Sequence, residues 1–132
     1  MSDTILAWEA YPNFTESEFI CSETGERAMQ FSFIAVLQKI RQIYGRPMII
    51  SSGYRSILHS SEKDKDVAGE HSLGLAADIL CNGRDALALI HIAQDIAVRR
   101  IGVNQKGDLN ARFVHLGIGD RFGLFPQAIW TY

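Results

Sequence analysis

Residues 69–80 read GEHSLGLAADIL, and this stretch decides how the rest of the sequence is interpreted. The short apolar run 75–80 predicts a β-strand, yet it contains Asp78, seven positions after His71. Small residues surround the pair and allow close approach of neighbouring backbone. Two interpretations are open: Asp78 is a polar residue at a strand end, or it is a carboxylate placed to meet the histidine.

The residues before this stretch predict one helix, one strand and one loop. Apolar residues recur at three- and four-residue spacing over 26–44, which predicts a helix that Gly45 and Pro47 end. The run MIISS at 48–52 predicts a short strand. Residues 54–70 are polar, rich in charge and without periodicity, so we expect a long loop there.

The residues after this stretch alternate between the same element types. Asn82 or Asp85 is expected to cap a helix over about 85–99. Strands are predicted at 100–104 and 112–118, and the short Gly/Asp/Asn turn between them indicates an antiparallel hairpin. The closing aromatics of IWTY are expected to pack back on the body. Together these elements predict a small α+β domain, 1–132, with a four-stranded antiparallel or mixed sheet packed with helices.

Composition narrows the class of protein. The chain has 132 residues, 47% of them hydrophobic, and a formal net charge of −2, as expected for one globular domain. Because the chain has neither a basic excess nor an apolar run of about 20 residues, we expect it to bind neither nucleic acid nor a membrane. We also expect a monomer. The N-terminus has no apolar core of a signal peptide. Cys21 and Cys81 are predicted to be free thiols, a disulfide between them being the less favoured alternative.

Four histidines could carry chemistry. His91 lies in the second predicted helix, where a partly buried structural histidine is expected, and His59 lies in the charged loop, where a surface histidine is expected. His115 alternates with Val114 and Leu116 along a strand, so it faces away from them. An isolated strand histidine is more often structural than a metal ligand.

A metal site is the alternative for His71 and Asp78. Together with a second histidine they make a three-ligand set that leaves a fourth zinc position open for water. Such a metal lowers the pKa of the water and polarises a carbonyl group, as a hydrolase needs. The spacing of this pair alone is only moderately specific. Arg55, just after the first strand, is either a surface residue or a guanidinium aimed into the same site to hold a carboxylate or an oxyanion.

Three ordered motifs carry a resemblance to a known family. They are SGYRS at 52–56, H-x-x-G-x-A-x-D-I at 71–79 and FVH at 113–115. In this combination the chain resembles the zinc D-Ala-D-Ala carboxypeptidases and the related phage peptidoglycan endopeptidases, whose fold is shared with the hedgehog signalling domain. F-x-x-S-E-F-x-C at 14–21 and Y-G-x-P at 44–47 are similar to a small phage- and bacteria-borne branch. The matches run from about residue 13 to 118.

The resemblance implies a site, a cofactor and a substrate. His71, Asp78 and His115 take the zinc-ligand positions, and Arg55 takes that of the arginine that binds substrate and steadies the transition state. The implied substrate is the peptide stem of peptidoglycan, cleaved next to a D-amino acid. The implied setting is a phage lysin or a virion-associated enzyme, located in the cytoplasm of an infected host before release or in the virion.

The chain also departs from the family pattern. Gly69 stands where many members have serine, Gly117 where close relatives have aspartate, and Arg112 where other branches have an acid. An aspartate at 117 would lie about 6–7 Å along the strand from His115 on the same face.

These departures leave the general base unassigned and open a second possibility. The candidate bases are Glu70, His59, Asp108 and Asp120. A site without its base should be slower by roughly 10²–10⁴-fold. The alternatives are therefore a catalytically impaired or inactive member that serves as a binding or phage structural module, or a zinc-free scaffold.

Overall fold

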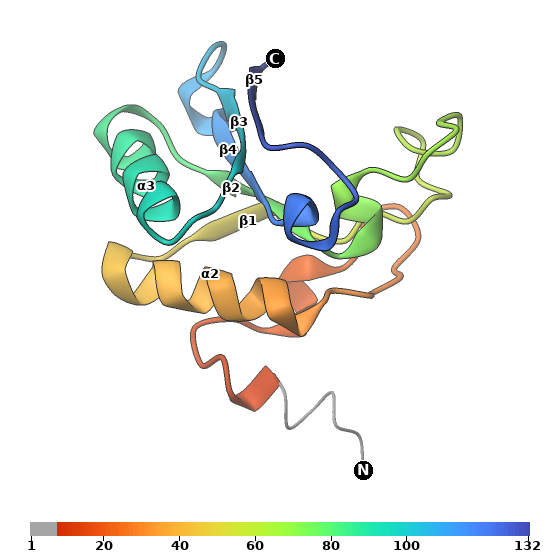
Figure 1. Ribbon diagram of the computed structural model, residues 1–132, viewed down its shortest axis with the longest axis horizontal. Helices are drawn as coiled ribbons and strands as arrows, with labels where there is room; N and C mark the ends of the chain where they lie inside the picture. The colour runs from red at the N-terminus through yellow and green to blue at the C-terminus, as the bar shows by residue number, and fades with distance from the viewer. Residues whose placement is uncertain (1–7) are drawn as a thin grey trace.

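The computed structural model describes residues 8–132 and shows an α+β domain with one mixed five-stranded sheet (Figure 1). The strands are β1 (Ile49–Ser52), β2 (Ala76–Leu80), β3 (Arg100–Asn104), β4 (Phe113–Gly117) and β5 (Ala128–Thr131), in the spatial order β1-β2-β4-β3-β5. The first four pair antiparallel, and β5 pairs parallel to β3. The α+β class and the antiparallel pairing of β3 with β4 are therefore confirmed.

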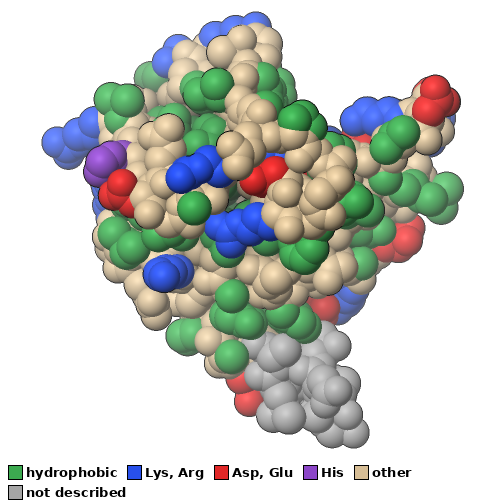
Figure 2. Space-filling model, viewed as in Figure 1, with side chains coloured by type: hydrophobic (Ala, Val, Ile, Leu, Met, Phe, Trp, Pro, Cys, Tyr) green, Lys and Arg blue, Asp and Glu red, His purple; other side chains and the backbone are tan. Residues whose placement is uncertain are grey.

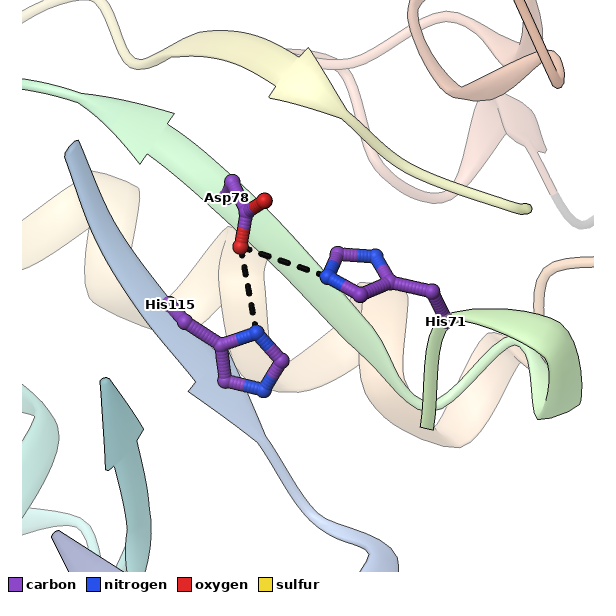
Figure 3. A group of neighbouring side chains, drawn as sticks. All are labelled: His71, Asp78 and His115. Atoms are coloured by element: carbon purple, nitrogen blue, oxygen red, sulfur yellow. Dashed lines mark hydrogen bonds and ion pairs between the residues drawn. The ribbon is translucent and has the colours of Figure 1, made fainter. Parts of the chain in front are cut away.

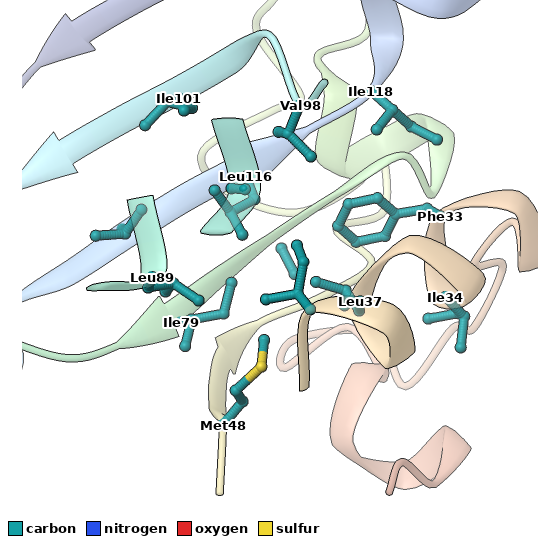
Figure 4. Packing of buried hydrophobic residues seen from close by; sticks show 14 of the residues in the cluster. Phe33, Ile34, Leu37, Met48, Ile79, Leu89, Val98, Ile101, Leu116 and Ile118 are labelled. Carbon is teal, nitrogen blue, oxygen red and sulfur yellow. The ribbon is translucent and has the colours of Figure 1, made fainter. Parts of the chain in front are cut away.

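Helices α2 (Phe31–Tyr44) and α3 (Gly83–Asp95) contribute to one hydrophobic core with the strands (Figure 4). Val114 and Leu116 of β4 are fully buried in it, as their alternation with His115 predicts. Apolar burial of this kind supplies the main favourable term of folding. The fully buried side chains include Phe33, Leu37, Ile79, Leu89, Val98 and Ile118.

Two helix boundaries differ from the predicted ones. Helix α2 begins at Phe31 rather than near 26, because the Gln30 N–H donates to the carbonyl of Gly74 (3.0 Å) and the preceding residues pack against that turn. Helix α3 begins at Gly83 because Asn82, rather than Asp85, is its N-cap, and it ends at Asp95 before a left-handed residue at Ala97. The predicted stop of α2 at Gly45 is confirmed.

The C-terminal aromatic segment does more than pack on the body, because it forms the fifth strand. Four strands were predicted, but Ala128–Thr131 pair with β3 from Arg100 to Val103. The segment is short and ends the chain, so it lacked the flanking turn signals that mark a strand in a sequence. Its addition to the edge brings Trp130 opposite Gly102.

The surface carries mixed charge. On the face shown in Figure 2, Lys and Arg side chains lie scattered among acidic, hydrophobic and other polar side chains. Both cysteines are free, with Cys21 buried and Cys81 half-buried, as predicted. Among the described residues, no helix combines the length and the apolar character needed to cross a bilayer.

Substitution of Gly74 measures how tightly the turn at Gly74 packs against the segment before α2. Gly74 has φ +71°, and a Cβ there would lie 2.1 Å from the carbonyl oxygen of Ala28. Gly107 has φ +78°, and a Cβ there would meet no atom within 4 Å. Its substitution therefore measures the cost of a positive φ alone. We expect Gly107→Ala to lower the free energy of unfolding by about 1–2 kcal/mol. Gly74→Ala should cost about 2 kcal/mol more, because the overlap with backbone adds to that penalty.

Urea unfolding followed by circular dichroism measures both losses. Equal losses for Gly74→Ala and Gly107→Ala would show that the Gly74 turn does not press on the segment before α2.

Candidate metal centre

The site begins with one cross-strand pair. In the register of β2 with β4, Asp78 lies directly opposite His115. Their neighbours Ala77, Ile79, Val114 and Leu116 enter the helix-covered core, so the pair points to the opposite face of the sheet. The carboxylate in the apolar run is thus explained, because every second residue of β2 leaves the core.

The third member comes from the short 3₁₀ turn Glu70–Leu73. Gly74 ends this turn, and the backbone N–H of Arg55 donates to the carbonyl of His71 (3.1 Å). The His71 Nδ1 lies 2.9 Å from the carbonyl oxygen of Gly53, which can only accept a hydrogen bond. Nδ1 therefore carries a proton, so Nε2, which faces Asp78, is the His71 nitrogen available to a metal.

The three side chains converge on one point, as Figure 3 shows. Asp78 Oδ1 lies 3.3 Å from His71 Nε2 and 3.1 Å from His115 Nδ1. One ligand atom from each residue lies within 4.8 Å of the others, and all three residues are buried. Tetrahedral zinc with bonds of about 2.0–2.1 Å separates its ligand atoms by about 3.3–3.5 Å. The two distances from Asp78 Oδ1 are close to this spacing, and small side-chain shifts that draw the two imidazole nitrogens together would let the three atoms hold zinc without a change of fold.

In the metal-free protein the cluster is held together by charge. Burial disfavours ionisation of Asp78, but hydrogen bonds from His115 and His71 outweigh it and hold the Asp78 pKa well below its usual range. Burial also disfavours a charged His115, yet hydrogen bonds to Asp78 and Glu70 raise the His115 pKa above its ordinary value. The carboxylates and the imidazolium thus stabilise one another until a metal replaces the protons.

Arg55 lies in the same pocket, so of the two interpretations of this residue the structure favours the one aimed into the site. Its Nη2 is 3.0 Å from Ser52 Oγ and 3.7 Å from Asp78 Oδ2, and its Nη1 is 3.2 Å from Glu62 Oε2. The side chain is 22% exposed, so the guanidinium is held by neighbours and still reachable from the pocket. Glu62 was not foreseen as a site residue, because it lies in the charged loop, where an acid ordinarily faces solvent.

An aromatic wall was also missed by the sequence interpretation. Phe113, Phe125, Trp130 and Tyr132 line the pocket beside the three candidate ligands. The Trp130 ring lies 4.9 Å from the His115 ring, centroid to centroid. Alternation along the strand places Phe113 on the same face as His115. The signal for Trp130 and Tyr132 was the closing IWTY run, which became informative only once the pairing of β5 was known.

Of the four candidate bases, Glu70 lines this pocket and the other three do not. His59 is half-buried and forms an ion pair with Glu23, Asp108 caps a short 3₁₀ turn, and Asp120 lies after β4. His91, expected to be partly buried, is exposed on α3, because it lies on the side of the helix turned away from the core.

The charge network predicts how the stability of the metal-free protein depends on pH. Because the folded-state pKa of His115 is raised, its stabilisation is complete below about pH 6.5, the unfolded value, and is lost as the pH rises through the folded pKa. Because the pKa of Asp78 is lowered, its stabilisation is present above about pH 4 and is lost on acidification. Stability should therefore be greatest between about pH 4.5 and 6.5.

Urea midpoints in the presence of chelator measure this profile. The decline above pH 6.5 should be smaller in His115→Gln and unchanged in the control His91→Gln. A decline of equal size in both variants would assign it to other groups.

Comparison with known proteins gives one match. A family model described as Peptidase M15 matches residues 12–117, most of the chain and all the residues of the candidate centre. No curated protein matches the sequence. The matched span holds the three candidate ligands and Arg55 in the arrangement described above. The chain therefore belongs to the peptidase M15 family of metallopeptidases, the family of the zinc D-Ala-D-Ala carboxypeptidases.

Proposed function

We propose that this protein is a zinc-dependent peptidase that cleaves peptidoglycan stem peptides next to a D-amino acid. One observation carries the proposal: His71, Asp78 and His115 bring their ligand atoms within 4.8 Å of one another. They do so inside a pocket that also contains Arg55. The membership in the peptidase M15 family supports the same reaction class.

The residues of the chain divide the work as follows. His71 Nε2, Asp78 Oδ1 and His115 Nδ1 would hold the ion, and Gly53 and Glu70 fix the two imidazole rings through their other nitrogens. Zinc at this position supplies an activated water nucleophile and polarises the scissile carbonyl. Burial of the three ligands keeps bulk water away and strengthens each electrostatic contact.

Arg55 would bind the substrate. Its guanidinium is permanently charged and offers paired N–H donors to a carboxylate or to the oxyanion of the tetrahedral intermediate. Ser52 and Glu62 hold it on two sides, so little side-chain freedom is lost when substrate binds. The aromatic wall, made of Phe113, Phe125, Trp130 and Tyr132, offers an apolar surface to the methyl groups of alanine residues in the peptide stem.

We propose a phage lysin or a virion-associated enzyme as the biological setting, acting as a monomer. A second candidate function is a non-catalytic cell-wall-binding module on the same fold. The contacts of the two acids in the pocket support this second candidate. Glu62 contacts Arg55 and Lys65, and Glu70 contacts His115 and Arg100. Each of the two carboxylates is engaged by cationic partners, so neither is free to act as the general base.

Metal analysis and peptidoglycan digestion separate the two functions. We expect one zinc per chain and new amine termini from purified peptidoglycan, both lost in His71→Ala and both retained in the control His91→Ala. EDTA should lower the melting temperature of the parent, since a ligand of the native state present at about 100 times its Kd adds about 2.7 kcal/mol. Zinc binding without new amine termini would support the binding module instead.

Replacement of Arg55 tests the substrate role. Arg55→Gln should lower kcat/KM for a stem peptide by about 10²–10³-fold, because it removes a charged donor aimed at the reacting carboxylate or oxyanion. Zinc content should be retained. Arg46→Gln, which removes a surface ion pair with Asp85, is the matched control. Equal kcat/KM values for both variants would remove Arg55 from substrate binding.

A further inference from the structure

The Glu70 carboxylate is fixed by three contacts from three different segments. Oε1 lies 2.9 Å from His115 Nε2 on β4 and 2.9 Å from Arg100 Nε on β3. Oε2 accepts a hydrogen bond from the backbone N–H of Gly119 (2.9 Å). The residue is only 4% exposed. Both oxygens are therefore held against donors, and the side chain has one defined position.

This position coincides with the space that a side chain at residue 117 would fill. A Cβ on Gly117 would lie 2.3 Å from Glu70 Oε2 and 2.5 Å from both Cδ and Oε1. Gly117 is not among the glycines with positive φ, so its backbone conformation suits any residue. Space for the Glu70 carboxylate, and not backbone geometry, is what requires glycine at 117.

The contact with His115 links this carboxylate to the candidate metal centre. The His115 Nδ1 faces Asp78 and the point where the three ligand atoms converge, whereas Nε2 faces Glu70. A carboxylate that accepts the N–H of one imidazole nitrogen leaves the other nitrogen with its lone pair for a metal, and it orients the ring.

We propose that Glu70 is the positioning residue of this centre, acting through His115, and that Gly117 is glycine in order to admit its carboxylate. The proposal rests on the zinc site of the proposed function. It gives Glu70 a role other than general base, because both of its oxygens are already engaged. The carboxylate expected at residue 117 is thus supplied from residue 70, and Gly117→Asp alone would collide with it.

Zinc affinity tests the positioning role. Glu70→Gln keeps the shape of the side chain but can no longer accept hydrogen bonds at both oxygens. We expect it to weaken zinc binding by about 10–100-fold in competition with a chromogenic chelator, and to alter the visible spectrum of the Co²⁺ form. The control is Glu23→Gln, which replaces an acid outside the pocket that pairs with His59, and it should stay within about threefold of the parent. Equal affinities and spectra for Glu70→Gln and the parent would overturn the proposal.

A double-mutant cycle in the metal-free protein tests whether the Glu70 carboxylate and a side chain at residue 117 compete for the same space. Gly117→Ala should lower the melting temperature by roughly 5–10 °C in the parent, because the new Cβ displaces a fixed carboxylate. The same change should cost less than about 2 °C in Glu70→Ala, where the space is empty. Equal losses in both backgrounds would contradict the role given to Gly117.

A double variant tests whether a carboxylate at residue 117 can replace the one removed from residue 70. Glu70→Ala/Gly117→Asp should bind zinc at least about tenfold more tightly than Glu70→Ala, because the second substitution restores a carboxylate next to His115. No gain would count against positioning by this carboxylate. If the parent bound no zinc, the proposed function would fail, whereas the metal-free cycle would still decide whether Glu70 and Gly117 share one space.

Discussion

The pairing of β2 with β4 in one register is the constraint on which the site depends. It sets Asp78 opposite His115 and sends both side chains to the face away from α2 and α3. A shift of one residue would turn Asp78 into the core and an apolar neighbour into the pocket. The register is held by core packing of Ile79 and Leu116 on the other face, so the hydrophobic core and the candidate metal centre are two results of the same alternation.

The parts of the centre that come from loops are fixed by backbone contacts to that sheet. Gly74 ends the turn that carries His71, and the Gly74 carbonyl accepts a hydrogen bond from the Gln30 N–H. The carbonyl of Gly53 orients the His71 imidazole. Buried polar groups are costly unless they are paired. In this pocket the pairing is dense, with Glu70 contacting His115, Arg100 and Gly119. This network fixes the orientation of the His115 imidazole in the metal-free protein.

Much of this arrangement could be predicted from the sequence, because it depends on short-range patterns. The alternation around His115 and the apolar run around Asp78 gave the strands, and the ordered motifs gave His71 and Arg55. What could not be predicted depends on contacts between distant segments. The strand at Ala128–Thr131 needed a partner edge on β3, and the start of α2 at Phe31 depended on the Gly74 turn. The missing acid at Gly117 was read as a loss, since only the structure shows Glu70 in that space.

Anomalous diffraction from crystals soaked in zinc would locate the ion. We expect a single strong zinc peak about 2.0–2.2 Å from His71 Nε2, Asp78 Oδ1 and His115 Nδ1, with Glu70 still against His115 Nε2. A zinc peak away from these three atoms, or one bound to His115 through Nε2 with Glu70 displaced, would contradict this expectation.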